Sequence, residues 1–442
     1  MVFRLAAGKA ETLLTTPWRK RVPTSPGSTR RWEIDALRGL MLVLMTLTHL
    51  PTRLSSPMGQ PFGFVSAAEG FVLLSAYVTG MVYTRLAQKQ GIEAMRRAFW
   101  RRALKVYFCQ AACLLVLFTV VAAVGMRIAH PPVREIIRFY LQEPVTAMLS
   151  GLALVYEPPL LDILPMYVVF MLVSPVVLGF GLKRGWGRVI GASVLLWVLA
   201  QFDFGRWLHG QMVDITGLPV SYLRTGPFVT FAWQFLWVLG LWMGAHDTDK
   251  AAARFQFPGW AVAFAAVYAA FFFGWRHVFG QIPFPQGVWL NDSFDKWHLA
   301  PARLINLFAL MVLAMHFAEW LKARLPRLRV LETLGSASLP VFCAHLFLVL
   351  LVLAWWGDAA TARPIWGDAL LLAAVFLALY AVAAVTVWLD NTPARWVPAH
   401  ETHPDSMDTS PELPPPLEGA RLTERLQRAP GVAEPARLPS HP

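Results

Sequence analysis

The stretch "RRWEIDALRGLMLVLMTLTHLP" (residues 30–51) places charged side chains around an otherwise apolar run, and a histidine lies near its end. The whole chain of 442 residues has the same character, since 56% of it is hydrophobic and only 15% is charged. Long apolar runs with Trp and Tyr near their ends are typical of proteins that cross a bilayer. Within lipid, a helix satisfies its own backbone hydrogen bonds. The sequence therefore predicts an all-α, polytopic membrane helix bundle.

About ten apolar runs approach the length of about 20 residues that crosses the hydrocarbon core. They lie at 34–51, 62–84, 103–127, 160–181, 188–203, 226–245, 257–276, 301–321, 333–356 and 366–389. The N-terminal segment and every second segment after it together hold 23 Lys and Arg residues, whereas the opposite set holds 10. Because Lys and Arg favour the cytoplasmic side, both termini are expected to be cytoplasmic.

Three regions differ in composition. Residues 1–33 are basic and have no apolar core before the first span, so we expect a cytoplasmic segment and no cleavable signal peptide. Residues 34–390 form the predicted membrane domain. Residues 391–442 contain 11 prolines and few aromatic residues, which predicts a disordered, Pro-rich cytoplasmic tail.

The charge and the cysteines exclude other classes of protein. The net charge of +12 is accompanied by no motif of nucleic-acid binding, and basic residues gather on the cytoplasmic side of membrane proteins anyway. Cys109, Cys113 and Cys343 fall inside apolar runs, which indicates neither a disulfide framework nor a zinc site. We therefore expect no nucleic acid, no metal and no bound cofactor.

Arg38 and His49 lie on the same face of the first predicted helix. They are 11 residues apart, which is almost three turns and a rise of about 16 Å. Asp35 precedes Arg38 by three residues and can pair with it. Arg38 then binds an anion on the cytoplasmic side and His49 acts as a base, or both are interfacial residues with their polar ends in the headgroups.

Glu69 lies about seven residues inside the second apolar run, too deep for its short side chain to reach the interface. An ionisable residue at that depth indicates function by default. The hairpin between the first two spans brings Glu69 toward His49, where a carboxylate would hold the imidazole in the correct tautomer. The alternative is a structural pair with Arg53 or another buried cation.

A basic cluster follows the second span in "RRAFWRRALKVYF". Its members are Arg97, Arg101, Arg102 and Lys105. Such a cluster contacts anionic lipid and sets topology. It would equally suit a polyanionic donor such as a nucleotide-containing thioester, and both interpretations stay open here.

The pattern Asp35-x-x-Arg38-Gly39, with His49 eleven residues after Arg38, resembles the first-helix signature of the acyltransferase-3 family of integral membrane O-acyltransferases. Five further stretches, in this order, are similar to its OpgC branch: "QPFGFVSAAEGFVLLSA" (60–76), "LPMYVVFMLVSPVV" (164–177), "WQFLWVLG" (233–240), "DKWHLAPARLINLFAL" (295–310) and "LGSASLPVFCAHLFL" (334–348).

The resemblance, which covers residues 30–390, implies an enzyme of the bacterial inner membrane. The enzyme would move a succinyl group from cytoplasmic succinyl-CoA, an acyl-CoA donor substrate, to hydroxyls of an osmoregulated periplasmic glucan. One departure is visible, because Ser75-Ala76-Tyr77 stands where the family often has Ser-Gly-Phe/Tyr. The added methyl group of Ala76 would tighten a helix contact or a tunnel, and so would affect which acyl chain the enzyme accepts.

The resemblance assigns donor binding to Arg38 and catalysis to His49. Other residues in the branch's motif stretches are Glu69, Tyr167, Gln234, Lys296, Arg303 and His345. Lys296 and Arg303 would bind the succinyl carboxylate or an anionic glucan, or would lie at the outer interface. His345 is a second base or a packing residue, and Tyr167 and Gln234 are hydrogen-bonding residues of the bundle.

Two further functions stay open. A proton-coupled transporter or exporter of a glycan or small anion would use Arg38, Glu69, His49 and His345 as a relay. The sequence shows no internal repeat, which counts against transport. An O-acyltransferase acting on another extracellular polysaccharide would carry the same motifs.

Overall fold

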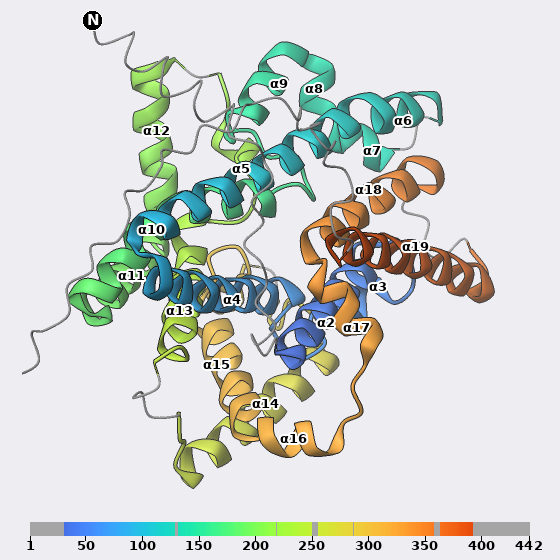
Figure 1. The fold of residues 1–442 in the computed structure, drawn as a ribbon. Helices are drawn as coiled ribbons and strands as arrows, with labels where there is room; N and C mark the ends of the chain where they lie inside the picture. Colours follow the sequence, from blue (N-terminus) through green and yellow to red (C-terminus); the bar gives the residue numbers. More distant parts are fainter. Residues whose placement is uncertain are drawn as a thin grey trace, which may run out of the picture. The chain divides into compact units, whose positions relative to one another are not determined.

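Helices account for every regular element of the part of the chain that the structure describes. Figure 1 shows the computed structural model, which describes residues 31–391 apart from 129–130, 218, 250–254, 286 and 358–362. The absence of strands within these ranges confirms the predicted all-α fold. Apart from residues 31–33 and 391, the predicted N-terminal segment and C-terminal tail lie outside the described residues.

Six helical stretches of the described residues are each long and apolar enough to cross a membrane. They are α4 (Ala67–Gln90), the run of α5 (Ile92–Val116), η1 (Leu117–Val121) and α6 (Ala122–Ile128), α10 (Ile163–Arg184), α14 (Gly259–Phe279), α18 (Ser338–Trp356) and α19 (Ile365–Asn391). Two bent pairs raise the number to as many as eight. They are α11 (Trp186–Ala200) with α12 (Phe204–Thr216), bent by 79°, and α15 (Pro301–His316) with α16 (Ala318–Arg324), bent by 57°.

Two more of the ten predicted spans correspond to helices with a weaker membrane signature. Helix α2 (Trp32–His49) carries Glu33, Asp35 and Arg38. Helix α13 (Thr230–His246) has 17 residues and is about 26 Å long, a little less than the hydrocarbon thickness. The chain is thus a polytopic membrane protein, and the predicted number of ten spans is approximate.

Short helices lie between the long ones. They are α3 (Ser55–Met58), α7 (Pro131–Ile136), α8 (Arg138–Gln142), α9 (Pro144–Leu152), η2 (Tyr222–Arg224), η3 (Trp289–Phe294) and α17 (Arg329–Ser336). Several of them fall in the Pro- and Gly-rich segments of the sequence, where long helices cannot continue. The segments just before α10, α13 and α15 supply one wall of the site described below.

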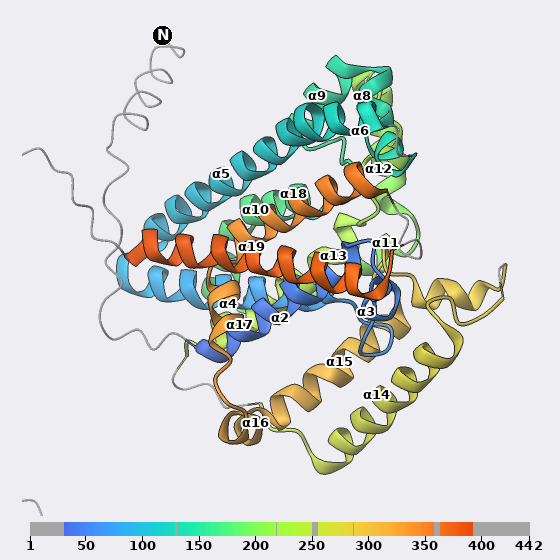
Figure 2. The same cartoon turned by 90° about the vertical axis from the view of Figure 1, so that its right-hand side faces the viewer.

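Glycine allows α2 to pack closely against α17 (Figures 1 and 2). A Cβ atom at Gly335 would overlap the carbonyl oxygen of Asp35, and one at Gly39 would overlap that of Leu331. Small residues are the usual means of close helix contact in a membrane, because apolar side chains gain little by leaving lipid. This contact holds the first turns of α2, which carry Arg38, against the segment that leads into α18.

Candidate functional site

Two histidines from distant helices lie in direct contact. His49 is the last residue of α2, which ends just before Pro51, and His345 lies in the middle of α18. The Nδ1 atom of His49 is 3.0 Å from the Nε2 atom of His345, and the two rings stack with their centroids 5.2 Å apart. His345 is completely buried. The shared face that the sequence predicts for Arg38 and His49 therefore receives a partner from α18.

Backbone contacts decide which nitrogens carry hydrogens when both rings are neutral. The Nδ1 atom of His345 lies 3.0 Å from the carbonyl oxygen of Phe342, one turn earlier in α18. A carbonyl only accepts hydrogen bonds, so Nδ1 of His345 must donate and its Nε2 must accept. The Nδ1 of His49 then donates to His345. This leaves Nε2 of His49 as the basic nitrogen of the pair.

His49 lines a cavity of about 610 Å³, which we call the His49 cavity. Its walls come from the end of α2, the start of α4 and the segments before α10, α13 and α15. They include aromatic and ionisable residues, among them Tyr222, Trp297, Asp162, Lys296 and His298. A volume of this size accommodates an organic ligand, with polar groups placed to orient it. His49 is thus a base with room for a substrate beside it.

Burial alters the ionisable groups of this cavity. Burial raises the pKa of Asp162, which precedes α10, to about 6, although hydrogen bonds from backbone N–H groups oppose the shift. Burial lowers the pKa of Lys296, and the negative charges of Glu69 and Asp162 partly oppose this effect. The Lys296 ammonium also lies 4.7 Å from the ring of Trp297, a cation–π distance. The lining of the His49 cavity thus combines a cation, a carboxyl group and an aromatic surface.

His298 and Asp295 form a second pair in this wall. The Nδ1 atom of His298 lies 2.6 Å from a carboxylate oxygen of Asp295, and its backbone N–H donates to the same oxygen at 2.9 Å. The Asp295 hydrogen bond raises the pKa of His298. The pKa of Asp295 is lowered, because its bonds with His298 outweigh the opposing effect of burial. The pair stiffens the turn that presents Lys296 and Trp297.

Arg38 lines a smaller cavity of about 20 Å³, which we call the Arg38 cavity. Arg102 and Tyr167 also line it. The guanidinium of Arg38 lies 3.6 Å from the carboxylate of Asp35 and donates to the hydroxyl of Ser338. The predicted pair of Asp35 and Arg38 is therefore present, and the cavity beside it has room for about one water molecule.

The other predicted basic residues of α5 lie outside this cavity. Arg97 and Arg101 are exposed, and their Nε atoms donate to carbonyl oxygens one turn back in the same helix. Gln234 bonds within the bundle, with its side chain 2.7 Å from both the hydroxyl and the carbonyl oxygen of Ser193. As the structure describes them, Arg97, Arg101 and Gln234 line neither of the two cavities.

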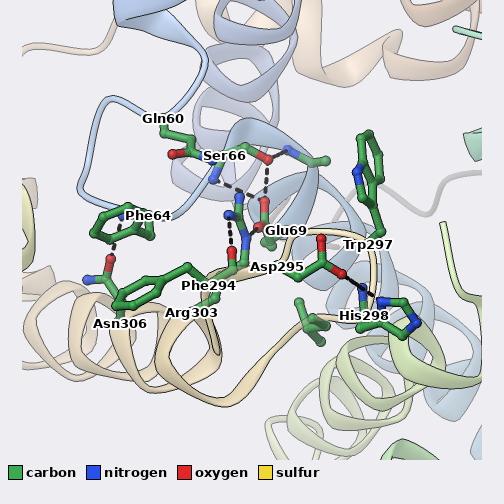
Figure 3. A network of polar contacts seen from close by, with 12 residues as sticks. Gln60, Phe64, Ser66, Glu69, Phe294, Asp295, Trp297, His298, Arg303 and Asn306 are labelled. Carbon is green, nitrogen blue, oxygen red and sulfur yellow. Dashed lines mark hydrogen bonds and ion pairs between the residues drawn. The ribbon is translucent and has the colours of Figure 1, made fainter. Parts of the chain in front are cut away.

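Glu69 contacts Arg303 and Ser66 (Figure 3). Its carboxylate accepts from the Nε atom of Arg303 and from the hydroxyl and backbone N–H of Ser66, the latter at 3.0 Å. Ser66 and Glu69 form a capping box at the start of α4, and both Glu69 and Arg303 are completely buried. The prediction that Glu69 holds the imidazole of His49 is corrected, because the partner of that imidazole is His345.

The ion pair between Glu69 and Arg303 supports the structural alternative for Glu69, with Arg303 and not Arg53 as the buried cation. Arg53 forms an ion pair with Asp368 at 3.5 Å, whereas Arg303 forms the ion pair with Glu69. Arg303 therefore ties α15 to α4 within the bundle. Lys296, seven residues earlier, is the cation that lines the His49 cavity.

Sequence patterns did not single out several residues of the site. Asp162, Trp297 and His298 come from irregular segments and Tyr222 from the three-residue helix η2, and such segments are too short or too irregular to have a period that indicates a face. The one available signal was the density of aromatic and ionisable residues in "DKWHL". Among the residues that the structure describes, no group of three or more His, Cys, Asp and Glu residues is placed to hold a metal ion.

The fold and the site define a polytopic membrane protein with two histidines in contact, one of which, His49, lines a large cavity. Comparison with known proteins adds the family. A family profile described as "OpgC protein" matches residues 30–391, and the chain therefore belongs to the OpgC family. Membership implies a membrane acyltransferase and points to glucans as acceptors. The same comparisons found no match among curated proteins and none among solved structures.

Proposed function

We propose that the chain is an O-acyltransferase of the bacterial inner membrane, with both termini in the cytoplasm. It transfers a succinyl group from cytoplasmic succinyl-CoA to hydroxyls of an osmoregulated periplasmic glucan. The contact between His49 and His345 carries this proposal, because it leaves one basic nitrogen on a residue that lines the His49 cavity.

The acceptor sugar occupies the His49 cavity. Its CH faces stack on the rings of Trp297 and Tyr222, and its hydroxyls bond to groups such as Asp162. An aromatic surface beside a buried carboxyl group suits a neutral, polyhydroxylated ligand better than an apolar one. The volume of about 610 Å³ admits one or two sugar rings of a larger glucan, the rest of which stays outside.

The donor approaches from the Arg38 side. Its phosphates meet Arg38 and Arg102, which line the same small cavity, and the exposed Arg97 and Arg101 add long-range attraction. Arg38 and His49 are separated by a helical rise of about 16 Å. An extended pantetheine arm is comparable in length, so the thioester reaches the histidines while its nucleotide stays near the basic residues.

The reaction needs one proton acceptor. Nε2 of His49 takes the proton of a glucan hydroxyl while the hydroxyl oxygen attacks the thioester carbonyl. The carbon–sulfur bond then breaks, the ester forms, and His49 returns the proton to the leaving thiolate. His345 accepts the hydrogen bond from Nδ1 of His49 and stabilises the imidazolium during the reaction. Lys296 supplies positive charge in the same cavity, where the carbonyl oxygen gains negative charge.

The test is the mass of periplasmic glucans from cells that lack this chain and are complemented with wild type or with His49→Ala. We expect succinyl esters with the wild type and none with the variant, at equal amounts of folded protein in the membrane. Full substitution with His49→Ala would refute the mechanism. An unchanged glucan combined with esters on another extracellular polysaccharide would reassign the acceptor.

Transport is the other candidate that the sequence left open. A relay would need Glu69 to exchange protons with the histidines, yet its carboxylate is bonded to Arg303 and Ser66. Export of a glycan without acyl transfer by membrane vesicles that contain the wild-type chain, and its loss in His49→Ala, would support transport over acyl transfer.

A further inference from the structure

We infer that Phe342, together with Phe71 and Ile163, forms an apolar septum between the Arg38 cavity and the His49 cavity, and that the acyl arm of the donor must displace the Phe342 ring to reach His49. The septum itself follows from the arrangement of the cavities. Its role toward the donor rests on the proposed function.

The two cavities share part of their walls. Ile163 at the start of α10 and Phe342 in α18 line both of them, and Phe71 in α4 lines the Arg38 cavity. The rings of Phe71 and Phe342 stack with centroids 5.7 Å apart and an interplanar angle of 18°. All three side chains are buried. Apolar side chains from three different helices therefore separate the two cavities.

Side chains can move there while the backbone stays in place. The side chain of Phe342 lines both cavities, whereas the backbone carbonyl oxygen of Phe342 accepts the hydrogen bond from His345. A rotation about the side-chain torsions of Phe342 opens the path without breaking the bond that orients the histidine pair. The ring also lies 5.2 Å from the ring of His345, so the acyl arm passes directly beside the catalytic pair.

A seal at this point has a physical purpose. A continuous wet path through the bundle would let protons cross and dissipate the membrane potential. An apolar constriction stops water and ions by dewetting. The pantetheine arm carries no charge, and the succinyl carboxylate at its end crosses only while the ring of Phe342 is displaced. The septum therefore stops water and ions whenever no donor occupies it.

The experiment measures proton leak through liposomes that contain the purified full-length chain and a trapped pH-sensitive dye. Phe342→Ala should raise the leak about tenfold over wild type, with Phe342→Leu and Phe71→Ala in between, because each removes part of the dewetted constriction. Phe170→Ala is the matched control. Phe170 is equally buried and packs on Trp237 at 5.4 Å, but it lines neither of these two cavities as the structure describes them.

The outcomes separate the septum from the proposed function, because the leak assay contains neither donor nor acceptor. A leak in folded Phe342→Ala, Phe342→Leu and Phe71→Ala that equals that of Phe170→Ala would overturn the septum. If Phe342→Ala does not fold, the other two variants decide the question. A second measurement follows hydrolysis of succinyl-CoA in the absence of glucan, which should rise in Phe342→Ala because water reaches the thioester.

If the leak rises while His49→Ala still acylates the glucan, the septum stands and the proposed function fails. If His49→Ala abolishes acylation while no septum variant leaks, the proposed function stands and the septum fails.

Discussion

The Nδ1 atom of His49 lies 3.0 Å from the Nε2 atom of His345, although 296 residues separate them in the chain. The contact turns a histidine at the end of one helix into an oriented base. In the proposed mechanism, His345 acts through His49. Each of the following predictions tests one part of the arrangement around this contact.

His345→Ala should lower kcat by about 10² to 10⁴ with little change in KM for the donor, because the imidazole of His49 loses its partner. His345→Gln should restore part of the rate, since a side-chain amide oxygen also accepts a hydrogen bond. Steady-state kinetics on purified protein measures both values. A loss of folded protein without a change in kcat would assign His345 to packing alone.

Arg102→Ala should raise the KM for the acyl donor about tenfold or more, because Arg102 lines the Arg38 cavity and a bond to a phosphate is charge-assisted. Arg101→Ala, on the exposed face of the same helix, should change KM about twofold or less. Raising the salt concentration should reduce the effect of Arg101 more than that of Arg102. Equal effects of the two variants would point to general attraction by the basic cluster.

Glu69→Gln and Arg303→Gln should each destabilise the protein by about 3 to 5 kcal/mol, because either change leaves a buried charge without its partner. The exposed pair of Glu93 and Arg96 is the control, and its loss should cost no more than about 1 kcal/mol. Thermal unfolding in detergent measures both. A Glu69→Gln protein of normal stability but without activity would restore the catalytic role that the sequence predicted.

Gly335→Ala should destabilise the protein by about 1 to 3 kcal/mol or more, because its Cβ overlaps the Asp35 carbonyl and forces α2 away from α17. Donor binding should weaken as well, since Arg38 lies in the displaced turns. Gly191→Ala in α11 is the control, because a Cβ atom there meets no other atom within 4 Å. Equal melting temperatures of the two variants would exclude the close helix contact.

The pair of Asp295 and His298 should make stability depend on pH. His298 has a raised pKa in the folded protein, so its contribution is complete below its ordinary value of 6.5 and is lost as the pH rises through the folded pKa. Asp295 has a lowered pKa, so its contribution is present above its ordinary value of 3.8 and is lost as the pH falls. Asp295→Asn should therefore lower the melting temperature most between pH 3.8 and 6.5.

The control for this pH dependence is Asp292→Asn, a change at an exposed residue of η3 in the same segment. It should lower the melting temperature little at any pH. A melting difference between Asp295→Asn and wild type that stays constant from pH 4 to 9 would show that the pair does not contribute through its charges.

Several parts of the site were predictable from single helices. The period of 3.6 residues places Arg38 and His49 on one face and Asp35 beside Arg38, and the structure shows the Asp35 contact. Contacts between helices were not predictable in this way. Glu69 was expected near His49 because a hairpin joins their helices, but α15 brings Arg303 to that carboxylate from 234 residues away.

An all-α membrane protein follows from the amino-acid sequence alone, because apolar runs of this length satisfy their backbone hydrogen bonds in lipid as helices. The sequence also predicts which residues share a face of each helix. Which of these faces meet is known only from the packed structure. The pairing of His49 with His345, the shared walls at Phe342 and Ile163, and the partner of Glu69 depend on how the helices rotate and cross, and close packing of side chains from distant segments sets those angles.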